Sequence, residues 1–105
     1  MNKILVIAPH PDDETLGCGG TLFRHNENGD KIYWLIITGI SEKNGWSKET
    51  VKNRDAEIDA AAEKYGFVGV FNYRFPAVKI DTVPISDLIE KITDVYKKVE
   101  PEIIY

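Results

Sequence analysis

Four short apolar runs are the feature that most constrains how this chain can fold. They cover residues 3–8, 32–38, 68–75 and 102–105, and branched and aromatic side chains dominate them. Continuous apolar runs of this length are typical of strands that are buried on both faces of a sheet. The sequence therefore predicts a sheet that is covered by other elements on both sides.

Helical patterns connect these runs in sequence. Apolar residues recur at helical spacing over about residues 15–28, 47–65 and 85–100, with Ser47 as an expected cap and Gly66 as a stop. Strands that alternate with helices form parallel sheets through right-handed crossovers. The predicted fold class is therefore α/β, a Rossmann-like three-layer sandwich with a mostly parallel sheet.

One domain accounts for the whole sequence. The 105 residues are 43% apolar and 29% charged, as in ordinary globular chains, and no repeat or linker divides them. The sequence stops within the apolar run Ile103-Ile104-Tyr105, where a parallel sheet normally continues into further structure. We therefore expect residues 1–105 to be the N-terminal portion of a longer domain.

Charge and hydrophobic length exclude several classes of protein. The 17 acidic and 13 basic residues give a net charge of -4, so the basic footprint of a nucleic-acid-binding protein is missing. No apolar stretch reaches the roughly 18 residues of a membrane span, and the run after Lys3 is too short for a secretory signal. The single cysteine, Cys18, excludes an intramolecular disulfide and a multi-cysteine zinc site. We expect a cytoplasmic protein, and its oligomeric state is left open.

The segment that carries chemistry directly follows the first predicted strand. His10, Asp12, Asp13 and Glu14 place an imidazole and three carboxylates at the carboxyl end of that strand, where parallel sheets bind ligands. Repulsion among the carboxylates is unfavourable unless a cation or a helix start compensates it. His10 and Asp13 are candidate metal ligands, since zinc accepts both donor types. The alternative is that an aspartate only caps the next helix and His10 lies in a proline-bounded turn.

A longer string around these residues resembles a known family. Residues 8–20 read APHPDDETLGCGG, which closely resembles the opening signature of the PIG-L/LmbE family of zinc-dependent N-acetyl-sugar deacetylases. Arg54-Asp55-Ala56-Glu57 resembles the family's Arg-x-x-Glu helix, and residues 101–105 resemble its next strand. One departure is Pro9, because the family usually has alanine directly before the histidine. Both candidate ligands remain in place, and the likeness covers essentially the whole chain.

The resemblance implies metal-dependent hydrolysis of the N-acetyl group of an N-acetylglucosamine-type sugar or glycoconjugate. It makes His10 and Asp13 ligands of Zn²⁺ or another divalent metal, and Asp12 the catalytic base. The family's third ligand is a histidine beyond the strand that here ends at Tyr105, so this chain lacks it. The remaining histidine, His25, is expected on the helix surface. We therefore expect the chain alone to bind metal weakly and to be inactive or nearly so.

Four further residues are candidates for substrate contact. Ser41 and Trp46 lie in the polar loop after the second predicted strand, where an indole can stack on a sugar face or simply anchor the loop. Arg74, at the end of the third strand, suits a phosphate or carboxylate, and a surface salt bridge is the alternative. By itself the spacing of Arg54 and Glu57 indicates an exposed helical pair. The family resemblance moves Arg54 toward substrate contact.

Two other functions remain open. The glycines of the segment 17–20 follow a strand, as in a dinucleotide-binding loop, but Leu22 occupies the last glycine position of Gly-x-Gly-x-x-Gly. Close packing of helix on sheet is the better explanation of these glycines. The alternatives to a deacetylase are therefore a Rossmann-like nucleotide binder and a non-catalytic structural or regulatory module that lacks a complete site.

Overall fold

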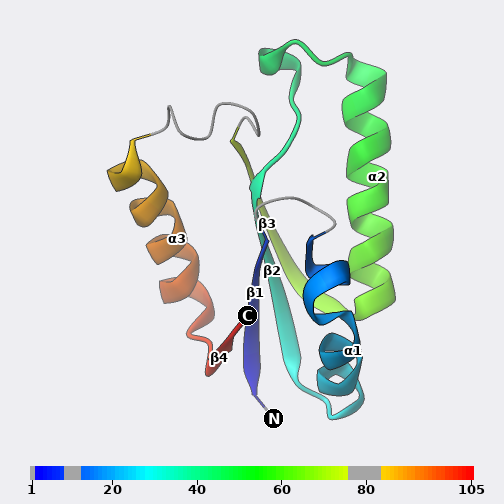
Figure 1. Ribbon diagram of the computed structural model, residues 1–105, viewed down its shortest axis with the longest axis vertical. Coiled ribbons are helices and arrows are strands. Elements are labelled where there is room, and N and C mark those ends of the chain that lie inside the picture. Colours follow the sequence, from blue (N-terminus) through cyan, green and yellow to red (C-terminus); the bar gives the residue numbers. More distant parts are fainter. Residues whose placement is uncertain (1, 9–12, 76–83) are drawn as a thin grey trace.

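Strands and helices alternate along the whole chain, as predicted. The computed structural model describes the backbone of residues 2–8, 13–75 and 84–105, and the side chains of these residues except 13–19 and 44. The elements are β1 (Lys3–Ala8), α1 (Asp13–Glu27), β2 (Lys31–Thr38), the 3₁₀ helix η1 (Glu42–Asn44), α2 (Lys48–Tyr65), β3 (Phe67–Phe75), α3 (Ile85–Val99) and β4 (Ile103–Ile104). Figure 1 shows their arrangement, which confirms the α/β class.

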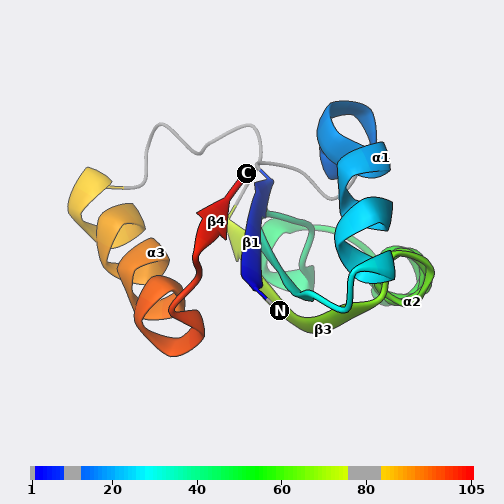
Figure 2. The same cartoon turned by 90° about the horizontal axis from the view of Figure 1, so that it is seen from below.

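The strands form one parallel sheet in the order β3-β2-β1-β4. In its register Val6 lies opposite Trp34 and Leu5 lies opposite Ile104. Figure 2 shows α1 and α2 on one side of the sheet and α3 on the other, so the predicted three layers are present. Because the strands are parallel, the carboxyl ends of β1, β2 and β3 share one edge, the upper edge in Figure 1.

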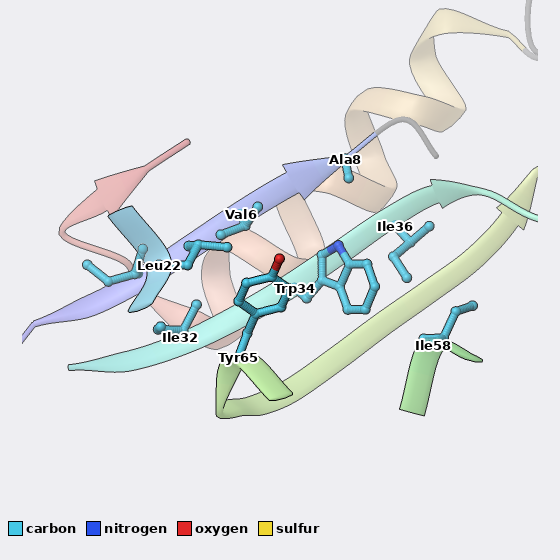
Figure 3. Close-up of a cluster of buried hydrophobic side chains, with 9 residues drawn as sticks. Val6, Ala8, Leu22, Ile32, Trp34, Ile36, Ile58 and Tyr65 are labelled. Atoms are coloured by element: carbon cyan, nitrogen blue, oxygen red, sulfur yellow. The ribbon is translucent and has the colours of Figure 1, made fainter. Parts of the chain in front are cut away.

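The larger core lies between the sheet and the helices α1 and α2. Trp34 is its largest side chain, is 0% exposed, and stacks on Phe67 with ring centroids 5.1 Å apart. Figure 3 shows the indole beside the side chain of Tyr65 from α2. We call this cluster the α1/α2 core; its buried members are Ile4, Val6, Ala8, Leu22, Ile32, Trp34, Ile36, Ile58 and Tyr65.

A smaller core lies on the opposite face, beneath α3. Leu5 and Leu35 from the sheet meet Val95 and Val99 from the helix, and we call this cluster the α3 core. The Tyr73 hydroxyl of β3 donates a hydrogen bond to the carbonyl of Lys91, at 2.9 Å, and so fixes one flank of α3 to the sheet.

The helix ends follow the predicted capping chemistry. The Ser47 hydroxyl accepts a hydrogen bond from the backbone N–H of Thr50 at 3.1 Å, and Gly66 ends α2 with a φ of 74°. None of the helices that the structure describes is both long and apolar enough to cross a membrane.

The surface loop predicted over residues 39–47 contains one short 3₁₀ helix, η1. One local prediction was wrong. Close packing does not explain Gly20, because a side-chain carbon there would meet no described atom within 4 Å. Gly17 and Gly19 lie outside the described side chains.

Candidate active site

The predicted catalytic motif follows β1 in sequence, and the strand order of the sheet reverses at β1. From β1 the chain proceeds to β2 and β3 on one side, and β4 then pairs with the other side of β1. Such a reversal leaves a crevice at the carboxyl ends of the strands, which is the usual ligand site of open α/β sheets. The segment that follows β1, with His10, Asp12 and Asp13, connects that point to α1.

The side chains of this motif lie outside the described residues. β1 ends at Ala8 and α1 begins at Asp13, two residues earlier than the helical pattern predicted. The predicted roles of His10 and Asp13 as metal ligands and of Asp12 as base therefore stay predictions. Among the side chains that the structure does describe, no three of His, Cys, Asp or Glu gather closely enough to hold a metal ion.

Arg74 joins three elements at the same edge. Its guanidinium donates hydrogen bonds to the carbonyl of Ile40 at 3.2 Å and to the carboxylate of Asp55 in α2 at 2.8 Å. The backbone of Arg74 has a φ of 57°, a conformation that is uncommon outside glycine. The pair with Asp55 is the salt bridge that the sequence allowed, and its side chains are 35% and 37% exposed. Contact between Arg74 and a substrate stays a prediction.

Gly39 permits the close approach of β2 and β3 beside this pair. Its N–H donates to the carbonyl of Phe75 at 3.0 Å. A side-chain carbon at Gly39 would lie 3.3 Å from the Arg74 Cα and 3.4 Å from the Asn72 Oδ1. That Oδ1 is buried and has no hydrogen-bond partner among the described residues. The sequence analysis identified neither Asp55 as the partner of Arg74 nor Asn72 as a neighbour of Gly39. Both pairs join residues of different elements, which local sequence patterns do not reveal.

The other three candidates for substrate contact come from the segment between β2 and α2 and from α2 itself. Arg54 lies 3.6 Å from Glu57, and their side chains are 42% and 71% exposed, so the predicted exposed pair is confirmed. Trp46 is 49% exposed, and its backbone N–H donates to the Ser41 carbonyl at 3.3 Å. The indole therefore remains available to solvent. Binding of a sugar by Ser41, Trp46 or Arg54 is still a prediction.

An open groove of about 460 Å³ runs along α2 beside this loop. Asp55, the partner of Arg74, lies in its wall. Its lining carries both signs of charge; the residues are Glu42, Lys48, Val51, Lys52, Asp55, Ala56 and Asp59. Its volume falls within the range of small-molecule sites, and it connects η1 with the helix that carries Arg54.

His25 serves a different edge of the molecule. Its Nδ1 lies 2.7 Å from Asp30 Oδ2, and its Nε2 lies 2.9 Å from the Tyr105 hydroxyl. Only 14% of the His25 side chain is exposed, so the expected surface position was wrong. The Asn2 backbone N–H and His25 donate hydrogen bonds that lower the pKa of Asp30. These contacts connect α1 to the end of the sheet at which β1 and β2 begin. That end lies opposite to the carboxyl ends of the strands.

Comparison with known proteins assigns the family. The model of the PIG-L family, GlcNAc-PI de-N-acetylase, matches residues 5–105. The chain belongs to the PIG-L family. The predicted resemblance is confirmed, and the matched region includes the motif after β1, the helix α2 and the strand β4.

A curated relative and two solved structures resemble nearly the whole chain. The diacetylchitobiose deacetylase of Thermococcus kodakarensis is 26% identical over 99% of this chain and 40% of its own length. The crystal structure of a conserved protein from Thermus thermophilus is 34% identical, with a TM-score of 0.78 over 99% of this chain and 45% of that protein. GalB, the 4-carboxy-2-hydroxymuconate hydratase of Pseudomonas putida, is 25% identical, with a TM-score of 0.76 over 99% and 46%.

The chain corresponds to only part of each of these proteins. The chain spans less than half the length of each of these three proteins. A shared fold also does not decide the reaction, because one of these relatives is named as a deacetylase and another as a hydratase.

Proposed function

We propose that this chain provides the metal-binding and base-bearing part of an enzyme that hydrolyses the N-acetyl group of an N-acetylglucosamine-type sugar or glycoconjugate. One observation carries the proposal. The His10-Pro11-Asp12-Asp13 segment follows β1, at the strand-order reversal of a chain that belongs to the PIG-L family. The deacetylase from Thermococcus kodakarensis supports the choice of reaction.

The donor set of the motif fits a divalent cation. His10 offers an imidazole nitrogen and Asp13 a carboxylate oxygen, and zinc accepts both. When bound, Zn²⁺ or a similar cation would polarise the amide carbonyl and make water easier to deprotonate. Two protein ligands are fewer than the three that catalytic zinc sites normally use. The 105-residue chain therefore binds metal weakly and has little or no activity alone.

Asp12 is the proposed base because the resemblance to the PIG-L family assigns this role to the first aspartate of the motif and assigns metal binding to His10 and Asp13. Its carboxylate takes a proton from the water that attacks the acetamide carbon, and then returns that proton to the departing amine. The C–N bond breaks, and the products are acetate and a free amino sugar. This cycle restores the carboxylate and requires no redox partner.

The described residues at the carboxyl edge support substrate binding. The half-exposed indole of Trp46 offers a flat apolar surface for a sugar ring. Ser41 and Arg54 supply polar contacts from the loop and from α2. Arg74 is already bonded to Ile40 and Asp55, so its main contribution is to hold the loop after β2 against α2.

A second candidate reaction is hydration, because GalB has this fold and is named as a hydratase. Both reactions need an activated water, and only deacetylation releases acetate. The nucleotide binder and the non-catalytic module predict neither reaction. The product therefore separates deacetylation from hydration, and it separates both reactions from the two functions without catalysis.

The activity test uses a longer protein that contains residues 1–105. Acetate and free amine are measured with N,N′-diacetylchitobiose as substrate, before and after treatment with a chelator and after readdition of zinc. We expect acetate release that needs metal and that falls about 10²- to 10⁴-fold in Asp12→Asn. Full activity in Asp12→Asn, or in the chelated protein, would contradict the proposed roles.

A further inference from the structure

An extra residue in β3 changes the direction of the backbone at Arg74. Ile36 of β2 pairs with Asn72 of β3. The following pair joins Thr38 to Phe75, so β3 takes three steps where β2 takes two. Such a bulge bends its strand and re-aims a side chain, and bulges are frequent beside functional sites. Arg74 lies within this interval and has a φ of 57°, in the left-handed region that favours glycine.

The guanidinium of Arg74 connects the two ends of the segment between β2 and α2. We call residues 39–47 the β2–α2 loop, and Figure 1 shows this segment crossing above the sheet to the start of α2. Near the start of the loop, Arg74 donates a hydrogen bond to the Ile40 carbonyl. Beyond its end, Arg74 donates to the carboxylate of Asp55 in α2. One planar group can reach both acceptors because its N–H donors form a rigid fork.

Trp46 is attached to both parts of the chain that Arg74 connects. Its backbone N–H donates to the carbonyl of Ser41, the residue after Ile40, at 3.3 Å. The residue after Trp46 is Ser47, whose side chain caps α2. The position of Trp46 therefore depends on how the start of the loop lies relative to α2. The guanidinium of Arg74 fixes that relation, and the indole itself is 49% exposed.

The contacts of Arg74 favour an action through the loop over direct contact with substrate. Its Nη1 is bonded to the Ile40 carbonyl and its Nη2 to the Asp55 carboxylate, so both terminal nitrogens already have acceptors in the protein. An anionic group of a substrate would have to compete with Asp55 for the same fork. Holding the loop needs no such rearrangement. It also accounts for a left-handed conformation at a residue other than glycine, because local strain persists only where surrounding contacts enforce it.

We propose that Arg74 is a positioning residue, which holds the β2–α2 loop so that the Trp46 indole is already in place when substrate arrives. The inference rests on the proposed function, because it takes the ligand of Trp46 to be a sugar ring of the substrate. A loop that is ordered before binding loses less conformational entropy when the ligand binds, so the affinity is higher. Loss of the guanidinium should therefore weaken substrate binding without removing any group that takes part in the reaction.

Fluorescence anisotropy of Trp46 in the 105-residue chain tests the positioning without any substrate. The chain has two tryptophans, so Trp34→Phe provides a background in which Trp46 is the sole tryptophan. We expect Arg74→Ala and Arg74→Gly to lower the Trp46 anisotropy by similar amounts, because both remove the guanidinium. Arg74→Gly should unfold at a higher temperature than Arg74→Ala, because glycine adopts the left-handed conformation without strain. Arg24→Ala, at an exposed position of α1, is the matched control and should leave the anisotropy unchanged.

Kinetics of a longer protein that contains residues 1–105 test the consequence for substrate. With N,N′-diacetylchitobiose we expect Arg74→Gly to raise KM about three- to tenfold, with a kcat within about twofold of wild type. In a Trp46→Ala background the same substitution should raise KM by less than about twofold, because the two residues then act as one unit. Independent effects of the two substitutions on KM would show that Arg74 does not act through Trp46, and would overturn the proposal.

The two experiments separate failure of this inference from failure of the proposed function. Circular dichroism first checks that each variant is folded. An unchanged Trp46 anisotropy in both Arg74 variants overturns the positioning role, whether or not the protein is an enzyme. Acetate release with an unchanged KM in Arg74→Gly also overturns it, while the deacetylase stands. A lower anisotropy in a protein whose longer form releases no acetate supports the holding of the loop and refutes the proposed function alone.

Discussion

The two faces of the sheet are covered to different degrees. The face beneath α1 and α2 buries nine described side chains, Trp34 among them, and both helices contribute to this cluster. The face beneath α3 buries four described side chains, and the same helix leaves Ile85, Ile89 and Tyr96 exposed. Among the described residues, the core on the first face is therefore the larger of the two.

The difference also bears on stability. The α1/α2 core packs on the sheet face that carries Trp34, and the α3 core packs on the opposite face. Substitutions in the two cores should therefore differ in their cost to folding.

The largest loss of stability is expected from Trp34→Ala. The side chain is fully buried and stacks on Phe67, so its removal should lower the free energy of unfolding by about 3–5 kcal/mol. Trp34→Phe should cost clearly less, because the indole Nε1 has no hydrogen-bond partner among the described residues. Urea denaturation followed by circular dichroism measures both. Equal losses in the two variants would show that volume is not the cause.

A smaller loss is expected on the opposite face from Val95→Ala. Val95 is fully buried in the α3 core but has few buried neighbours there, so we expect about 1–3 kcal/mol. The same urea experiment ranks it against Trp34→Ala. A cost for Val95→Ala that equals or exceeds the cost for Trp34→Ala would refute the contrast between the two faces.

The amino edge should make stability depend on pH below neutrality. Hydrogen bonds from the Asn2 N–H and from His25 lower the pKa of Asp30 below its ordinary value. A lowered folded-state pKa gives stability that is present above the unfolded value and is lost as pH falls through the folded one. Thermal unfolding of wild type and Asp30→Asn should therefore differ at neutral pH and converge in acid. A gap that widens as pH falls would contradict this assignment.

The smallest effect is expected at the exposed pair of Arg54 and Glu57. Glu57→Gln should change stability by only about 0.2–0.5 kcal/mol, because the Glu57 side chain is largely in water and that of Arg54 is partly exposed. Adding salt should remove the difference. If Arg54 binds substrate in a longer protein, Arg54→Ala should raise KM there while Glu57→Gln leaves it nearly unchanged, and equal kinetic effects would argue for a purely structural pair.

The sequence predicted the elements well because their signals are local. Apolar runs, the Ser47 cap and the Gly66 stop each depend on neighbouring residues, and the observed bounds agree within a few positions. The family resemblance was likewise carried by short continuous stretches, above all the string around His10 and Asp13.

The missed features join residues that are distant in sequence. Arg74 meets Asp55 across 19 positions, and His25 reaches Tyr105 across 80 positions. No periodicity encodes such pairs. The predicted surface position of His25 was wrong for this reason, because its partners Asp30 and Tyr105 come from the chain segments before β2 and after β4. The sequence did not predict that Ile85, Ile89 and Tyr96 of α3 are exposed, because their spacing is the same as that of a fully buried helix face.

The most direct test of the account is a zinc titration of the 105-residue chain by calorimetry. We predict weak binding of one Zn²⁺ per chain that is lost in His10→Ala and in Asp13→Ala. His25→Gln is the matched control and should bind as wild type does, because His25 lies at the amino edge with partners of its own. Zinc binding that survives in His10→Ala, or that disappears only in His25→Gln, would contradict the central claim.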